Sequence, residues 1–480
     1  MSLQITLGRG GRLGSDLYQQ LRQRILDGRL PAGARLPASR ALARALRVSR
    51  NTVLGAYGRL GAEGFLGGRV GAGTFVADGV RAAPSRAPSG RRLRPLPRWA
   101  ALADPPAPIA PAPFDFRVGA PDPRLFPWDT WRRALARELR GRRPAPGYAP
   151  PEGEERLRAA IARHLAASRG VHAGAEDVLL CAGAQHAFDL VARILVEPGT
   201  CVAVEDPGYP PARQVLEAQG ARVVPVPVDG EGLVVAALPA DAQLVVVTPS
   251  HQFPLGVPMS LARRQALLEW SRRRGAAILE DDYDAEFRHD GRPLEALQGL
   301  DRHGRVLYVG TFSKLLLPTL RLGYVVAPAS LMGALRAARR LSDSHGPPEP
   351  QRALATLIEE GLFSRHLRKL HRIYRDRRDR LVTALERELG EVLELFPGAA
   401  GLHLAARCRD ERLDVPAWIA RARQAGVAVE GLQGYAVRRR VTGLAIGFGL
   451  IEAARVDEGV ARLAAAGGAP RAGALSAASP

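Results

Sequence analysis

The sequence predicts a chain of two folded domains: a small domain of helices and a β-hairpin over residues 1–78, and a larger α/β domain over residues 114–466. In the first segment, apolar residues recur at helical spacing. In the second, short β-branched runs alternate with stretches long enough for helices, which is typical of a mostly parallel sheet. Between the two, residues 79–113 hold nine prolines and no hydrophobic period, which predicts an extended linker. Residues 467–480 are low in complexity and are expected to form a tail.

The net charge of +20 is concentrated in the small domain. Residues 1–78 carry 12 arginines against 4 acidic residues, whereas residues 114–480 carry 50 basic against 43 acidic residues. A basic domain on a nearly balanced body is expected of a nucleic-acid-binding protein. The chain has no apolar run of about 18 residues and no signal-like stretch, so we expect a soluble, cytoplasmic protein without membrane contact.

Cysteines and histidines show no pattern of a disulfide framework or a metal site. Cys181, Cys201 and Cys408 are too few and too scattered, and the ten histidines show no HxxxH or HExxH spacing. We therefore predict neither a disulfide scaffold nor a bound metal.

Three helices and a hairpin are expected in the small domain. The first helix has an apolar residue at every fourth position from Leu13 to Ile25. Then follow a second helix capped by Ser39, a third capped by Ser49, and two strands around a glycine-rich turn with Arg69 at its tip.

The third helix has one apolar and one polar face. Val53, Tyr57 and Leu60 form the apolar face, whereas the opposite face carries short polar tips such as Asn51 and Thr52. Such a face lets the helix backbone approach a DNA groove. Periodicity alone fits a small structural domain equally well.

Three motifs decide between these alternatives: LPASR at residues 36–40, VSRNTV at 48–53 and GAGTFV at 71–76. They closely resemble the winged helix-turn-helix of the GntR family of bacterial transcriptional regulators. The resemblance implies binding to double-stranded operator DNA through phosphates and base edges. The contacts that it implies are Arg40, Ser49, Arg50, Asn51, Thr52 and, on the wing, Arg69.

Five β-branched runs in the body each end in a polar or glycine-containing turn. In an open α/β sheet, ligands bind beyond the carboxyl ends of the strands, so these turns are the candidate site segments. The runs lie at residues 177–180, 201–204, 244–247, 277–279 and 306–309.

The chemistry of these turns suits a flat, phosphorylated cofactor. Small residues at 181–186 lead into a helix whose free N–H groups suit a phosphate. Tyr209 can stack on a ring, a carboxylate after residue 279 can hold a pyridine nitrogen protonated, and a tyrosine there can bond a ring hydroxyl. Two aspartates beside a tyrosine also fit a general acid/base set or a metal site, but no His or Cys accompanies them at ligand spacing. Each turn alone is more often an ordinary loop.

Lys314 is one of two lysines among 68 basic residues. A guanidinium cannot form an imine, whereas a primary amine can. Lys314 follows an expected strand and a small polar turn, so we interpret it as a lysine that forms a Schiff base with pyridoxal 5'-phosphate. Lys369, in an arginine-rich segment, is expected to be an ordinary exposed helix residue.

Three body motifs, TPSHQFP at 248–254, EDDYDAEF at 280–287 and GTFSK at 310–314, are similar to those of the MocR subfamily of GntR regulators. The resemblance spans about residues 12–460 and implies a fold-type I aminotransferase-like domain, bound pyridoxal phosphate and a homodimer. It implies a Schiff base at Lys314, Asp281 against the pyridine nitrogen, Tyr283 near the ring 3-hydroxyl and Tyr209 stacked on the ring. It also implies Ala184, Gln185, Thr311, Ser313 and Arg321 around the phosphate, and His251 and Gln252 near the ring.

One position departs from the family pattern. Related sequences often carry an arginine near the C-terminus that holds the carboxylate of an amino-acid ligand, and Ala445 stands at that place here. Arg438, Arg439 and Arg440 lie just upstream, although a run of three arginines is more often a solvated turn.

The leading hypothesis is a transcriptional regulator that senses pyridoxal phosphate, or an amine or amino acid that reacts with it. The alternative is a working aminotransferase that carries a DNA-binding domain. Lys314 and Asp281 serve both functions, whereas Ala445 argues against a substrate clamp. A third alternative is a DNA-binding protein whose body has lost its cofactor. The retention of Lys314 in a chain with two lysines argues against it.

Overall fold

The computed structural model describes residues 5, 13–69, 73–78, 94–102, 109–141, 147–284, 286–289, 294–438 and 441–467. The chain forms two compact units, residues 1–95 and 96–480. Most of the predicted linker and nearly all of the predicted tail lie outside the described residues. In the described part of the chain, no helix has the length and apolar character needed to span a membrane.

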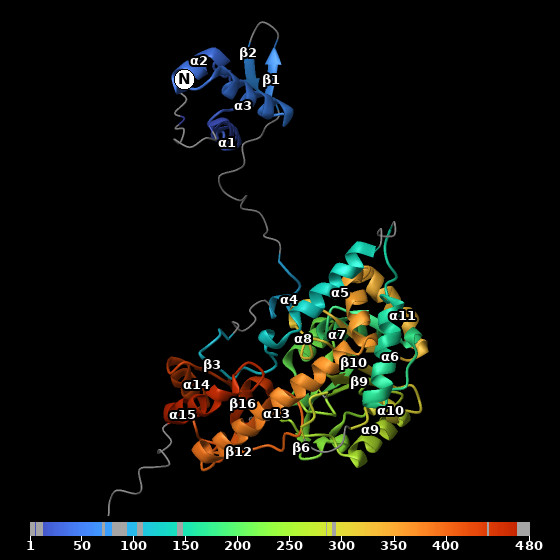
Figure 1. Cartoon of the computed structure of the whole chain (residues 1–480). Helices are drawn as coiled ribbons and strands as arrows, with labels where there is room; N and C mark the ends of the chain where they lie inside the picture. The colour runs from blue at the N-terminus through green and yellow to red at the C-terminus, as the bar shows by residue number, and fades with distance from the viewer. Residues whose placement is uncertain are drawn as a thin grey trace, which may run out of the picture. The chain divides into compact units, whose positions relative to one another are not determined.

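The first unit consists of three helices and a hairpin (Figure 1). Leu17, Leu21, Val53 and Leu60 are fully buried in its core, which confirms the predicted apolar faces. Strands β1 and β2 pair antiparallel, with Leu66 opposite Val76. The elements are α1 (Leu13–Leu26), α2 (Ser39–Leu46), α3 (Arg50–Ala62), β1 (Leu66–Arg69) and β2 (Gly73–Val76).

The two predicted helix caps differ in outcome. The Ser49 side chain accepts a hydrogen bond from the Thr52 amide at 3.1 Å, which confirms it as the cap of α3. Ser39 is not a cap. Ala38 occupies the N-cap of α2, because Ser39 is itself helical and its hydroxyl faces the Arg50 guanidinium, 3.5 Å from Nε.

The second unit is built on an eight-stranded sheet of order β4-β11-β10-β9-β8-β5-β6-β7. The five strands predicted from β-branched runs are all present, and β10, β9, β8, β5 and β6 run parallel. Strand β11 is antiparallel to both its neighbours. The bounds are β4 (Val178–Cys181), β5 (Cys201–Asp206), β6 (Arg222–Asp229), β7 (Gly232–Leu233), β8 (Leu244–Val247), β9 (Ala277–Asp282), β10 (Val306–Thr311) and β11 (Gly323–Val326).

Helices cover both faces of this sheet because the strand side chains alternate between two apolar cores (Figure 1). Val246 packs with helices α7, α8 and α11, whereas Val245 packs with α9 on the opposite face. The helices of the unit are α4 (Pro97–Ala100), α5 (Trp128–Gly141), α6 (Glu155–Arg169), α7 (Ala184–Leu195), α8 (Pro210–Ala218), α9 (Leu261–Arg274), α10 (Leu297–Leu300), α11 (Ala329–Ser342), α12 (Pro348–Glu359), α13 (Leu362–Leu389), α14 (Val415–Gln424) and α15 (Val456–Gly467).

A smaller sheet of order β12-β13-β16-β15 follows along the chain, with α14 and α15 beside it. Strand β14 pairs in parallel with β3, so the start of the unit is joined to its C-terminal part. This connection brings residues 116–120 close to the main sheet. The strands are β3 (Phe114–Asp115), β12 (Leu393–Leu395), β13 (His403–Cys408), β14 (Val427–Ala428), β15 (Glu430–Gly431) and β16 (Gly443–Gly447).

Candidate cofactor and DNA-binding sites

A cavity of about 1020 Å³ lies beyond the carboxyl ends of β9 and β10 in the second unit. Nearly all of the residues predicted to hold a cofactor line it together, although they come from four separate segments of the chain. These are Ala184, Gln185, Tyr209, Asp281, Tyr283, Thr311, Ser313, Lys314 and Arg321.

Lys314 follows β10 and is half-buried in the cavity wall. Its Nζ donates a hydrogen bond to the carbonyl oxygen of Gly119. Burial lowers the pKa of Lys314, and the carboxylates of Asp284 and Asp281 oppose that shift. A lower pKa increases the neutral fraction of the amine, which is the nucleophilic form. Lys369, by contrast, is exposed on α13, as predicted.

Asp281 is the penultimate residue of β9 and is 5% exposed. Burial raises its pKa well above the usual range, and the carboxylates of Asp282 and Asp284 add to the shift. Its Oδ1 atom has no hydrogen-bond partner. A buried acceptor of this kind costs free energy unless a donor completes it, so the site fits a protonated ring nitrogen.

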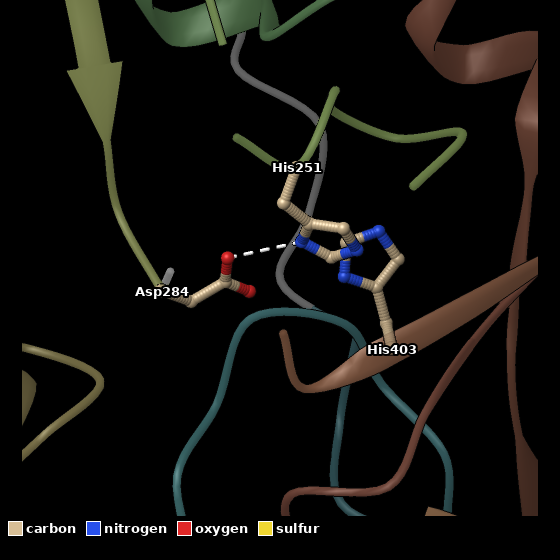
Figure 2. Close-up of side chains that lie close together, drawn as sticks. All are labelled: His251, Asp284 and His403. Atoms are coloured by element: carbon tan, nitrogen blue, oxygen red, sulfur yellow. Dashed lines mark hydrogen bonds and ion pairs between the residues drawn. The ribbon is translucent and has the colours of Figure 1, made fainter. Parts of the chain in front are cut away.

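The Tyr283 hydroxyl lies at the centre of a small hydrogen-bonded group. It donates to the His251 carbonyl at 3.0 Å, and its oxygen lies 2.9 Å from Nδ1 of His251. That Nδ1 also lies 3.0 Å from Oδ1 of Asp284 (Figure 2). Tyr283 is therefore held from behind while its ring faces the cavity.

His403 from β13 completes a buried cluster with His251 and Asp284 (Figure 2). The centroids of the two imidazole rings lie 4.8 Å apart, and Nε2 of His403 is hydrogen-bonded to the Pro254 carbonyl oxygen at 2.9 Å. Burial lowers the pKa of His403 to about 4. Sequence spacing does not show this cluster, because its members are up to 152 positions apart, with His251 and Asp284 in loops after β8 and β9 and His403 on β13.

His251 and Gln252 do not line the cavity. His251 lies behind Tyr283, as described above. Gln252 is fully buried, and its Nε2 donates to the Pro207 carbonyl at 2.8 Å and to Oε2 of Glu205 at 3.2 Å. In this structure the two residues support the walls of the cavity, whereas the resemblance implies that they lie next to the ring.

The opposite side of the cavity is suited to a phosphate. Ala184 and Gln185 form the first turn of α7, where N–H groups without a helical partner point outward. The Thr311 hydroxyl donates to the Ser313 hydroxyl at 2.9 Å, and the Arg321 guanidinium donates to the Ala182 carbonyl. Two hydroxyls, a guanidinium and a helix N-terminus can together bind a dianion.

Glycine is required at residue 183, between the end of β4 and this helix turn. Its φ is +84°, and a Cβ atom there would lie 3.2 Å from the Arg321 guanidinium. The backbone therefore comes close to Arg321 and leaves room for a ligand at the start of α7.

Among the cavity residues that sequence reasoning missed are Arg117, Gly119, Glu430 and Tyr435. They lie in segments near β3 and β15, far along the chain from the motifs. Ala445 itself is buried on β16, with Ala405 and Glu430 as its register partners on the two flanking strands, and it does not line the cavity. Arg438 is exposed, and Arg439 and Arg440 lie outside the described residues.

The predicted DNA contacts gather around the start of α3. Arg40, Ser49, Arg50 and Asn51 are exposed, and Thr52 is partly exposed. An exposed helix N-terminus flanked by guanidinium groups suits phosphates and base edges. Arg69 is the last residue of β1, and its side chain is not among those that the structure describes.

Both units match known protein families. Residues 115–463 match the aminotransferase class I and II family, and residues 13–76 match the bacterial regulatory proteins of the gntR family. The probable rhizopine catabolism regulatory protein MocR of Rhizobium meliloti is 41% identical over 82% of this chain and 80% of its own length. The pyridoxine biosynthesis transcriptional regulator PdxR of Corynebacterium glutamicum is 32% identical over 82% of this chain and 83% of its own length.

The body is also similar to solved aminotransferases. The α-aminoadipate aminotransferase LysN of Thermus thermophilus, in complex with N-(5'-phosphopyridoxyl)-L-leucine, matches with a TM-score of 0.68 and 30% identity, over 74% of this chain and 91% of that chain. The fold and the cavity thus define a DNA-binding domain joined to a fold-type I aminotransferase-like domain. The chain belongs to the MocR subfamily of GntR-family transcriptional regulators.

Proposed function

We propose that this regulator binds pyridoxal 5'-phosphate in the body cavity and that the bound cofactor, or an amine that reacts with it, changes operator binding by the first unit. The observation that carries the proposal is the unpartnered Oδ1 atom of Asp281 in a cavity that also holds Lys314. The family of the body binds pyridoxal phosphate. When bound, this cofactor supplies an aldehyde carbon and a ring that withdraws electrons from it.

Each residue of the cavity has a distinct part in the proposed complex. Asp281 would accept the proton-bearing ring nitrogen, Tyr209 would cover the ring, and Arg321 with Ser313 would hold the phosphate. Lys314 would offer its amine from the Gly119 side. Burial favours the neutral amine of Lys314, whereas a cation at the ring would favour the ionised form of Asp281.

We further propose that the protein acts as a cytoplasmic homodimer that presents two DNA-binding units to one operator. The support in the structure is apolar surface that a second copy can cover. Leu96 and Trp99 on or next to α4, Trp128 and Leu139 on α5, and Tyr148 are all exposed. A ligand shifts such an assembly only if it binds two arrangements with different affinity.

The cofactor assignment is tested by borohydride reduction of the protein with pyridoxal phosphate, followed by peptide mapping. The label is expected on the peptide that contains Lys314, and Lys314→Arg should lose it. Lys369→Arg is the matched control and should keep it. Retention of the full label in Lys314→Arg would reject the assignment.

The regulatory part is tested by footprinting the region upstream of the regulator's own gene with cofactor-free and cofactor-loaded protein. The concentration for half protection should differ between the two forms. Equal protection would remove pyridoxal phosphate as the signal. Rapid formation of a keto acid from a common amino acid would instead establish the alternative, an aminotransferase that carries a DNA-binding domain.

A further inference from the structure

Glu430 places a carboxylate in the cavity wall on the Gly119 side of Lys314. Lys314 contacts the Gly119 carbonyl, and the amide of the preceding residue, Val118, donates to Oε1 of Glu430 at 2.8 Å. The Tyr435 hydroxyl donates to the other carboxylate oxygen. Glu430 and Lys314 thus line the same cavity and contact adjacent backbone groups, Val118 and Gly119.

The negative charge of Glu430 has neutral partners in the described part of the chain. A backbone amide and a phenol hydroxyl are its hydrogen-bond donors, and no described basic side chain forms an ion pair with it. Each carboxylate oxygen keeps a free acceptor position. A ligand cation can therefore bind there without displacing an existing ion pair.

The nearby Arg117 does not supply a free cation. Its Nε and one terminal nitrogen donate to the two oxygens of Asp115 at 2.7 and 2.6 Å, and its other terminal nitrogen donates to the Ile109 carbonyl at 2.8 Å. A guanidinium that is already held by one carboxylate and one backbone carbonyl is less available to a second carboxylate. Arg213, on the Tyr209 side, is paired with Glu217 at 2.9 Å.

Ala445, on the neighbouring strand β16, supplies no cation near Glu430 either. It is the register partner of Glu430 in the β15–β16 pair. At the place where related sequences often carry an arginine, this chain has a buried methyl group, and the residue across from it is an acid. Glu430 thus adds a carboxylate at this end of the cavity, and the cation that interacts with it, Arg117, is already held by Asp115.

We propose that the ligand of this regulator is an amine whose far end is cationic, a diamine-like compound, and that Glu430 recognises that end. The inference rests on the proposed binding of pyridoxal phosphate. A charge-assisted hydrogen bond favours the cationic end, and repulsion between two carboxylates in a partly desolvated cavity disfavours an amino acid. Glu430 acts here as a specificity-determining residue.

The test uses three stable phosphopyridoxyl adducts made by reduction, which differ in the far end of the chain alone. They are the adducts of 1,4-diaminobutane, butylamine and 4-aminobutanoic acid. Calorimetry on the full-length, cofactor-free protein should show the diamine adduct binding roughly ten- to a hundredfold more tightly than the butylamine adduct. The 4-aminobutanoate adduct should bind more weakly than the butylamine adduct.

Glu430→Gln keeps an acceptor for the Val118 amide but removes the charge. We expect the preference for the diamine adduct to fall to about twofold, with the affinity for the butylamine adduct retained. Glu155→Gln, an exposed acid in the first turn of α6, is the matched control and should keep the wild-type order.

Two outcomes would overturn the proposal: 4-aminobutanoate and diamine adducts that bind the wild type equally well, or a Glu430→Gln variant that weakens all three adducts by one factor. The second result would show a purely structural role. Pyridoxal phosphate itself is measured first. Tight binding of pyridoxal phosphate without discrimination rejects this inference alone, whereas failure of both the cofactor and the adducts to bind rejects the proposed function as well.

Discussion

At Asp281, burial and the neighbouring carboxylates both raise the pKa of the carboxyl group. The carboxyl is almost completely buried beside Asp282 and Asp284, which raises its pKa, and Lys314 provides a weaker opposing effect. Oδ1 meanwhile lacks a partner. A cationic ring nitrogen would resolve both problems, since it supplies a donor and a positive charge. Asp281 is thus preorganised for a cationic ligand, because no described protein group donates a hydrogen bond to its Oδ1 atom.

The substitution Asp281→Asn should therefore weaken binding of pyridoxal phosphate. A hydrogen bond to a charged partner contributes about 1.5–3 kcal/mol, which corresponds to roughly 10- to 150-fold in affinity. The visible absorbance band should also shift. Titration of the cofactor-free protein checks this, with Asp129→Asn on α5 as an exposed control. Unchanged affinity and spectrum would argue against the contact.

Individual residues also show what sequence could predict about the site. Asp281 and Tyr283 lie at the end of the buried strand β9, and Lys314 lies three residues after the end of β10, so their chemistry and their position at a strand end were both visible in the sequence. Glu430 and Gly119 enter the same cavity from segments 311 positions apart, through the pairing of β3 with β14 and β15 with β16. No local pattern marks that pairing, because it depends on how the C-terminal sheet packs.

At the scale of elements, the ends of β5 and β8 are joined by a buried carboxyl. Oε2 of Glu205 accepts hydrogen bonds from the Thr248 hydroxyl at 2.5 Å and from the Gln252 amide at 3.2 Å. Burial raises the pKa of Glu205 to about 7. Its folded form therefore holds a proton at a pH where the unfolded chain has released it.

A raised carboxyl pKa gives stability that is present at low pH and lost as pH rises. The window for Glu205 runs from about 4.5, its unfolded value, to about 7. Over that range Glu205 contributes a decrease of at most about 3 kcal/mol in the free energy of unfolding. In Glu205→Gln, the urea concentration at which half of the protein is unfolded should fall less between pH 4.5 and 7 than it does in the wild type. Glu197→Gln, exposed just before β5, should match the wild type; an unaltered slope in Glu205→Gln would contradict the assignment.

The strand and helix pattern was largely visible in the sequence, and the missed elements share a cause. The parallel strands β4, β5, β8, β9 and β10 have near-continuous apolar runs because both faces are buried. Strand β6 carries Pro225 and Pro227 and is half-exposed, so its sequence lacks such a run. The short strand β11 is set by its antiparallel pairing on both sides.

Helix α3 leads to a prediction about how DNA is recognised. Arg50 begins the helix, and Arg40 lies on α2. If Arg50 contacts a base edge, Arg50→Ala should cost about 1–3 kcal/mol on the cognate duplex and much less on a scrambled one. Arg40→Ala should weaken both duplexes alike and reduce the salt dependence by about one phosphate contact. Titrations at several salt concentrations check this, with the exposed Arg273→Ala on α9 as a control; equal losses for Arg50→Ala would assign it to a phosphate.

At the scale of the whole molecule, Glu430 and its register partner Ala445 argue against turnover of amino acids. An aminotransferase must hold a substrate carboxylate while its lysine moves a proton, and the positioning of both ends accounts for much of the rate. Lys314 and Asp281 line the cavity, but Glu430 adds an acid to its wall, and Ala445 is buried and apolar outside the cavity lining. Under the proposed function, the cavity would therefore hold the cofactor without a clamp for a substrate carboxylate.

We therefore expect common amino acids to cause little change in the visible band and little keto-acid product, while the cofactor alone changes operator affinity. The physical reason is that, among the described residues, a ligand carboxylate finds no unpaired cation at the Glu430 end, and it loses its hydration on entry. A screen of amino acids and amines by absorbance, with keto-acid detection, checks the first part. In Glu430→Gln, binding of 4-aminobutanoate should increase, because the repelling charge is removed. Multiple turnovers of a common amino acid by the wild type would show that the clamp lies elsewhere and that the body works as an enzyme.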